Sequence, residues 1–203
     1  MATITAETVK TLRELSGAGV MECKRALEET GGDVEKAAAL LKERGQAAAA
    51  KRADRAANDG QVASYIHTGG RIGVLIEVNC ETDFVARTDE FQKLVRDLAM
   101  QVAGLRPIYA TLDSIPESDL EAKRAELLTS PALESKPEGV RGQIVEGQLK
   151  KWFSEVVLLE QPFRDQDITV GQLITQAIAR TGENIKVRRF ARFELGEELG
   201  EEM

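Results

Sequence analysis

The chain has 203 residues, of which 42% are hydrophobic and 30% are charged, and its net charge is −7; with glycine the apolar share reaches about half, which is usual for a globular protein and argues against general disorder. No apolar run approaches the roughly 18 residues that a membrane-spanning helix needs, and the first residues resemble neither a secretory signal nor a transit peptide. We therefore expect a cytoplasmic protein of one or two domains without membrane contact.

Residues 1–45 predict three short helices that form one compact module. The first, around residues 6–15, carries Leu12 and Leu15 on its apolar side and ends before two glycines, which favour a turn. The second begins near Val20 and ends at residues 30–32. The third starts at Asp33, whose carboxylate suits the unpaired N–H groups at a helix N-terminus, and apolar residues at helical spacing follow it.

Residues 46–59 are rich in alanine and basic residues and lack a wide apolar stripe, so we expect a helical or flexible connector. The connector shares one basic cluster with the helix before it: Lys42, Arg44, Lys51, Arg52 and Arg55. Acidic residues dilute this cluster, and we interpret it as a solvated face rather than an RNA site. The acidic excess of the chain, which lies after residue 110, also disfavours binding of phosphate backbones. We expect no direct contact with nucleic acid.

Residues 60–195 predict an α+β core that opens with an antiparallel hairpin. Hydrophobic residues alternate along 62–66 and 72–80, and residues 68–70 can form the turn between them. Thr88 is expected to cap a helix whose apolar face covers the hairpin. Further helices are predicted near 120–128, over 137–159 and from Thr169 to Gly182, followed by a closing strand over 185–193. The tail, 196–203, is acidic.

The sequence contains no motif of a recognisable enzyme. Neither phosphate-binding glycine loops nor the signatures of zinc proteases, serine hydrolases and kinases occur. Cys23, Cys80 and the single histidine, His67, fall short of the four ligands of a structural zinc site. Cys80 would act as a nucleophile only if His67 lay beside it in the fold, and a packed thiol is favoured. We expect no catalytic residue, no metal and no cofactor.

The segment Asn79–Ala86, NCETDFVA, lies between the end of the hairpin and the next helix. Its aromatic residue, Phe84, has two interpretations. It folds back under the hairpin as a core residue, or it projects as an anchor into a partner's pocket. The pattern alone favours the core. In a partner's pocket, burial of this side chain would contribute about 1.5–3 kcal/mol, and aromatic anchors of this kind are often interface hot spots.

Three stretches of the sequence resemble the bacterial elongation factor Ts family, the nucleotide exchange factors of elongation factor Tu. They are LRELSGAGVMECKRALEETGGDVEKAAALL, DGQVASYIHTGGRIGVLIEVNCETDFVAR and GENIKVRRFARFELGE. The stretches follow the family order, and the run EVNCETDFVA is too long for chance agreement. Longer family members carry a second core half and a coiled-coil-like insertion, so this chain resembles a short form.

The resemblance implies two contact sites on elongation factor Tu. The N-terminal module would be similar to a ubiquitin-associated domain and would contact the GTPase domain through Leu12, Gly19, Val20 and Met21, although helix core is an equally weighted interpretation of Met21. The second site would be the family's TDFV motif, formed here by Thr82, Asp83, Phe84 and Val85. In the family, its aromatic residue wedges between helices of the GTPase domain and disturbs the magnesium site.

The resemblance therefore favours an exposed Phe84, and it predicts exchange by binding alone. Nanomolar nucleotide is held by about 12 kcal/mol, so a partner must destabilise the bound state without making or breaking covalent bonds. Asp83 would either add repulsion near the phosphates or fix the loop through N–H groups. Both GDP-bound and nucleotide-free elongation factor Tu are expected partners.

Two further hypotheses concern partners. Short family members are thought to compensate for the missing core half by pairing, so we expect a homodimer, for which the closing strand could offer a sheet edge. The alternative function is a scaffold in which the ubiquitin-associated-like helices bind peptides or helices without exchange activity.

Overall fold

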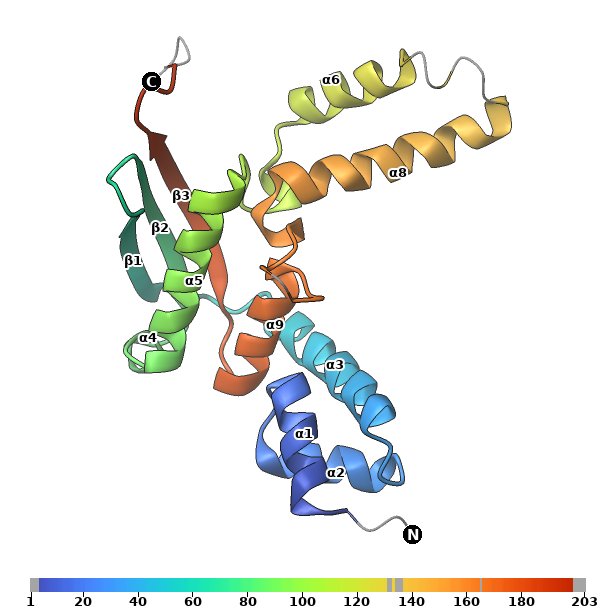
Figure 1. Ribbon diagram of the computed structural model, residues 1–203, viewed down its shortest axis with the longest axis vertical. Helices are drawn as coiled ribbons and strands as arrows, with labels where there is room; N and C mark the ends of the chain where they lie inside the picture. The colour runs from blue at the N-terminus through green and yellow to red at the C-terminus, as the bar shows by residue number, and fades with distance from the viewer. Residues whose placement is uncertain (1–3, 131–132, 134–136, 165, 199–203) are drawn as a thin grey trace. The chain divides into compact units, whose positions relative to one another are not determined.

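The computed structural model describes residues 4–130, 133, 137–164 and 166–198. Helices and a three-stranded antiparallel sheet make up the fold, which confirms the α+β class (Figure 1). Contacts divide the chain into two compact units. The first unit comprises residues 1–62, 77–95 and 172–187, and the second comprises 63–76, 96–171 and 188–203. No helix within the described ranges is long and apolar enough to cross a membrane.

The three predicted N-terminal helices are present in the first unit as α1 (Ala6–Ser16), α2 (Val20–Glu29) and α3 (Val34–Ala50), drawn in blue at the start of the chain in Figure 1. They pack around a small apolar core in which every member is completely buried: Leu12, Cys23, Ala26, Leu27 and Ala37. Leu15, expected on the same side as Leu12, is instead 64% exposed. The module therefore buries a narrower stripe of α1 than the spacing predicted.

Capping residues set the ends of these helices. Thr5 accepts the backbone N–H of Thr8 at the start of α1, which ends at Gly17 with a left-handed φ of 67°. Asp33 accepts the N–H of Lys36 at 3.0 Å, as predicted for the start of α3, and this hydrogen bond lowers the pKa of the Asp33 carboxyl. Helix α3 continues to Ala50, so the module boundary predicted at residue 45 falls within it.

The sheet contains β1 (Asp59–Ile66), β2 (Ile72–Cys80) and β3 (Lys186–Glu194), in the order β1-β2-β3. The hairpin is as predicted, and Gly69 and Gly70 turn it with φ of 92° and 68°. Alternate residues of β2 are buried, namely Val74, Ile76, Val78 and Cys80. Helix α5 (Asp89–Leu105) runs alongside the sheet (Figure 1) and buries the predicted apolar face: Phe91, Leu94, Val95, Leu98 and Val102.

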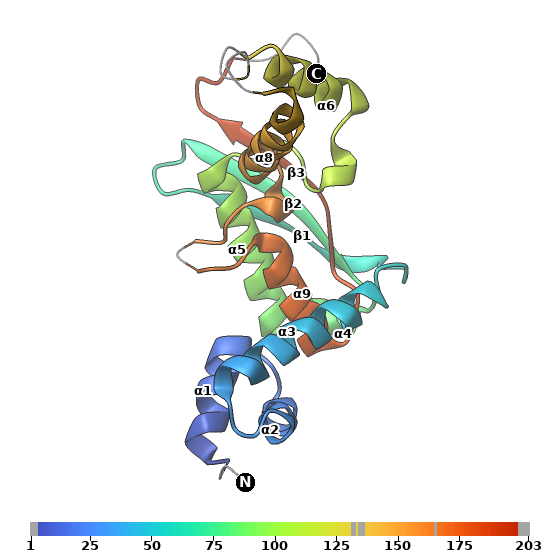
Figure 2. The same ribbon diagram turned by 90° about the vertical axis from the view of Figure 1, so that its right-hand side faces the viewer.

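The other helices are divided between the two units. The first unit contains α4 (Asp83–Ala86) and most of α9 (Val170–Thr181). The second contains α6 (Glu117–Leu128), α8 (Glu138–Val156) and the short turns η1 (Leu112–Ser114) and η2 (Leu158–Glu160). Helices α6 and α8 lie side by side, as Figures 1 and 2 both show, around buried Leu133, Val145 and Leu149.

Two predicted segments differ from the structure or lie partly outside it. The helix expected over 137–159 ends at Val156, where the backbone of Val157 becomes extended before η2. Of the predicted acidic tail, 196–203, only residues 196–198 are described.

Candidate partner-binding site

Phe84 lies on the four-residue helix α4, which directly follows the loop after β2. Thr82 is the N-cap of this helix, and its hydroxyl oxygen accepts the N–H of Val85 at 3.3 Å. Val85 and Ala86 take the inward positions and are 6% and 9% exposed, whereas Phe84 is 77% exposed. The core interpretation of Phe84 is therefore wrong, because its neighbours occupy the interior and the short helical turn directs the ring outward.

The other residues of the TDFV stretch have different surroundings. Asp83 is in the first turn of α4, where a negative charge suits the helix dipole. Its carboxylate forms an ion pair with Arg87 at 2.7 Å on the surface, an arrangement that contributes little to stability. Val85, which the resemblance placed among the contact residues, is buried. Its side chain therefore anchors α4 and does not form part of the surface.

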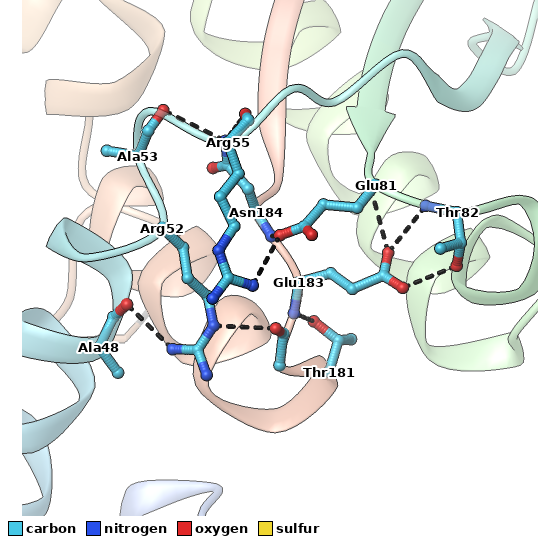
Figure 3. Close-up of polar contacts among 10 residues, drawn as sticks. Ala48, Arg52, Ala53, Arg55, Glu81, Thr82, Thr181, Glu183 and Asn184 are labelled. Atoms are coloured by element: carbon cyan, nitrogen blue, oxygen red, sulfur yellow. Dashed lines mark hydrogen bonds and ion pairs between the residues drawn. The ribbon is translucent and has the colours of Figure 1, made fainter.

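The backbone before α4 is held by a segment that follows α9. Oε2 of Glu183 accepts the N–H groups of Glu81 at 3.1 Å and Thr82 at 3.0 Å, and Oε1 accepts the hydroxyl of Thr82 at 2.6 Å. In return, the N–H of Asn184 donates to Oε1 of Glu81 at 2.7 Å. We call these four residues, Glu81, Thr82, Glu183 and Asn184, the carboxylate clasp (Figure 3).

The connector after α3 contributes to the same region. The side-chain amide of Asn184, which is 2% exposed, donates to the carbonyl groups of Ala53 at 3.2 Å and Arg55 at 2.8 Å. Nε of Arg52 donates to the carbonyl of Gly182 at 2.8 Å. Of the basic cluster, Arg52 is thus bound to the core's backbone, whereas the other four members are exposed, as a solvated face predicts: Lys42, Arg44, Lys51 and Arg55.

Sequence reasoning missed Glu183 and Asn184, although both lie in the third stretch that resembles the family. They follow Gly182, the residue predicted to end a helix, and they precede the closing strand. A carboxylate and an amide placed directly after a helix end are typical of local turns, so pattern alone gave no reason to connect them with residues about a hundred positions earlier.

Cys80 does not resemble a nucleophile. Its thiol is completely buried and donates to the carbonyl of Thr82 at 3.2 Å. Burial raises the pKa of Cys80 to about 11, and the negative charge of Glu183 adds to the shift, so the unreactive neutral thiol dominates at neutral pH. The ring of His67 has a different partner, since its Nδ1 shares a hydrogen bond with the hydroxyl of Tyr65 at 3.0 Å. Among the residues that the structure describes, no group of three potential ligands could hold a metal ion.

The N-terminal module exposes an apolar pair at the start of α2. Gly19 is the N-cap, and its N–H donates to the carboxylate of Glu22 at 3.3 Å. Val20 and Met21 follow in the first turn and are 53% and 60% exposed, so the helix-core interpretation of Met21 is wrong. Leu12, in contrast, is completely buried and contributes to this region only through packing.

Comparison with known proteins identifies the family. The family model described as elongation factor Ts matches residues 2–197. The chain belongs to the elongation factor Ts family. It is therefore a translation elongation factor, as the three family-like stretches predicted.

Curated relatives agree over nearly the whole chain. The chain is 57% identical to elongation factor Ts of Heliobacterium modesticaldum over 198 residues, which cover 97% of this chain and 92% of that protein. It is 53% identical to elongation factor Ts of an Anaeromyxobacter species over 98% of this chain and 91% of the relative. The 54% identity with elongation factor Ts of a Cyanothece species spans all of this chain but 78% of that protein, which is the longer of the two.

Proposed function

We propose that this elongation factor Ts family member promotes release of GDP from elongation factor Tu by inserting Phe84 into its GTPase domain, where the ring disturbs the magnesium site. The observation that carries this proposal is the 77% exposure of Phe84 on a helix whose N-cap, Thr82, is held by Glu183. A large aromatic ring held out in water is the kind of residue that becomes an interface hot spot.

Phe84, the wedge in this proposal, can promote GDP release only if binding of its ring is coupled to a change at the nucleotide site. Burial of the ring in a partner contributes about 1.5–3 kcal/mol, which is small beside the roughly 12 kcal/mol that holds a nanomolar nucleotide. The wedge therefore does not compete with the whole binding energy of GDP. It stabilises a conformation in which magnesium no longer neutralises the phosphates fully, and GDP dissociates faster from that state. Linkage then requires that GDP weakens binding of this chain by the same factor.

Two exposed residues of the N-terminal module form the second contact in this proposal. Val20 and Met21 present apolar side chains from the first turn of α2. Their contact would supply affinity for elongation factor Tu in both the GDP-bound and nucleotide-free states. Phe84 would make the affinity for the nucleotide-free state higher than that for the GDP-bound state. Asp83, on the same turn as Phe84, places a carboxylate beside the wedge, where it is paired with Arg87. No covalent step is involved, so the protein acts as an exchange factor in the cytoplasm rather than as an enzyme.

We also propose that two copies of the chain pair through the second unit. Strand β3 is at the edge of the sheet, and the second unit exposes large apolar side chains on or beside its strands, namely Ile66, Leu75, Phe193 and Leu195, each at least 49% exposed. An edge strand with apolar neighbours is a ready template for association. A second copy would cover these side chains and present two Phe84 wedges in one particle.

A kinetic experiment tests the exchange proposal. Elongation factor Tu loaded with a fluorescent GDP is mixed with excess unlabelled GDP and this chain, and release is followed with time. We expect wild type to accelerate release and Phe84→Ala to remove most of that acceleration. Leu128→Ala, which truncates a 60% exposed side chain on α6, is the matched control and should behave as wild type. If wild type binds elongation factor Tu but leaves release unchanged, the scaffold alternative is correct.

A further inference from the structure

We propose that Glu183 is a positioning residue for exchange, whose carboxylate holds Thr82 so that Phe84 is presented in one fixed orientation. This inference rests on the proposed function and adds to it a residue outside the TDFV stretch. It is drawn from the carboxylate clasp, which joins two parts of the first unit separated by about a hundred positions in sequence (Figure 3).

Glu183 controls the one hydroxyl that starts α4. The Thr82 hydroxyl donates its proton to Oε1 of Glu183 and accepts the N–H of Val85 with its oxygen. Because the proton is directed toward the carboxylate, a lone pair is directed toward α4. The other carboxylate oxygen accepts two backbone N–H groups, those of Glu81 and Thr82, and so fixes the peptide that leads into the helix.

Helix α4 needs this support because of its length. Four residues form a single turn, and a helix this short has no stability of its own in water. On its inward side α4 is anchored by Val85 and Ala86. The clasp fixes its N-terminal side, next to Phe84. Without the clasp, Phe84 would sample many orientations, and binding would have to order the loop at an entropic cost.

Substitution of Glu183 by glutamine tests the role of its carboxylate separately from the size of the side chain. An amide offers one acceptor oxygen and an NH2 group that cannot accept, so Glu183→Gln must lose at least one of the three hydrogen bonds while keeping the size of the side chain. We expect the maximal rate of GDP release to fall about tenfold, equivalent to about 1.4 kcal/mol. The concentration of factor that gives half-maximal release should change by less than about threefold, because the N-terminal module makes a separate contact.

The matched control is a carboxylate in the second unit. The side chain of Asp97 is 15% exposed, and its carboxylate forms an ion pair with Arg164 at 2.6 Å. Asp97→Asn removes a partly buried carboxylate that makes one ion pair and none of the clasp hydrogen bonds, and it should release GDP at the wild-type rate. Thr82→Val tests the same hydrogen bond from the other side. It should lower the maximal rate, and adding Glu183→Gln to it should cause little further loss. It also replaces Glu183→Gln as the test if that variant fails to fold.

Hydrogen exchange gives a readout that does not depend on elongation factor Tu. In Glu183→Gln, the amides of residues 81–85 should exchange faster than in wild type, while amides of α5 and the melting temperature stay nearly unchanged. Faster amide exchange together with slower GDP release supports the inference. Faster amide exchange with a wild-type release rate, or slower release with unchanged amides, overturns it. If Phe84→Ala releases GDP as wild type does, the proposed function itself has failed, and the amide data then tell only whether the clasp orders the loop.

Discussion

The hydroxyl group of Thr82 donates to the carboxylate of Glu183 across 101 positions of sequence, at 2.6 Å. The residue that begins the helix carrying the exposed aromatic ring is thus fixed by the segment between α9 and β3. The family-like middle stretch of the chain therefore depends on the family-like C-terminal stretch for its geometry.

Phe84 and Phe91 should differ sharply in their effect on stability, although they are seven positions apart. Phe84→Ala removes a ring that is 77% exposed, so the free energy of unfolding should change by no more than about 0.5 kcal/mol. Phe91→Ala removes a ring that is 1% exposed and should cost about 3–5 kcal/mol. Urea denaturation of both variants checks this. A large loss of stability in Phe84→Ala would mean that the ring packs inside the protein.

The exposed pair of the N-terminal module should affect affinity rather than the rate at saturation. In Val20→Ala/Met21→Ala, we expect the factor concentration for half-maximal GDP release to rise about tenfold or more, since each buried methylene-sized group that is removed contributes about 0.8 kcal/mol. The maximal rate should remain close to wild type. Titrations of release rate against factor concentration separate the two quantities. A fall in the maximal rate alone would contradict the assignment of separate roles.

Cys80 should react slowly with alkylating reagents at mildly alkaline pH. With a pKa of about 11, set mainly by burial and further by the charge of Glu183, about one thiol in a thousand is ionised at a pH near 8. Peptide mass spectrometry after timed alkylation distinguishes Cys80 from Cys23. Glu183→Gln removes the charge contribution, so it should lower the pKa and increase the labelling rate of Cys80. Equal rates in the two proteins would show that the carboxylate does not act on the thiol.

The same shift predicts how stability depends on pH. The ordinary pKa of the thiol, 9.0, applies to the unfolded chain, and the folded chain keeps the proton up to about pH 11. This contribution to stability is fully present below pH 9 and is lost as the pH rises toward 11. The difference in unfolding free energy between wild type and Cys80→Ser should therefore narrow over that interval. A difference that stays constant from pH 8 to pH 11 would contradict the raised pKa.

Pairing of two copies should depend on the exposed apolar residues of the second unit. We expect sedimentation velocity to give a dimer for wild type and a monomer for Phe193→Glu, because a charge placed in an apolar contact is costly to bury. Leu128→Glu, on α6, is the control and should remain dimeric. A wild-type monomer at all concentrations would remove the homodimer from the proposal without affecting the exchange mechanism.

Periodicity predicted the elements of this fold well because each element has a local cause. Asp33 caps α3, two glycines turn the hairpin, and alternate residues of β2 enter the core, all as the sequence indicated. Leu15 was placed wrongly because it has the right spacing for a buried residue, and spacing alone cannot tell how wide a stripe the neighbouring helices cover.

The site was less predictable, since it depends on contacts between distant segments. Pattern alone placed Phe84 in the core, because an aromatic residue after a buried strand is usually buried, and only the family resemblance favoured exposure. The direction of its ring depends on Val85 taking the inward position and on Glu183 fixing Thr82. Neither relationship has a signature within a short window of sequence.

The brevity of α4 sets a limit on how the wedge can be transferred to other molecules. A synthetic peptide copying residues 79–88 would contain the aromatic ring and its cap but none of the chain that follows α9. A graft of this segment onto an unrelated scaffold would also lack the chain that follows α9, and with it Glu183. A mimic that keeps the geometry of this turn therefore needs a carboxylate in the place of Glu183, which in this fold comes from the loop between α9 and β3.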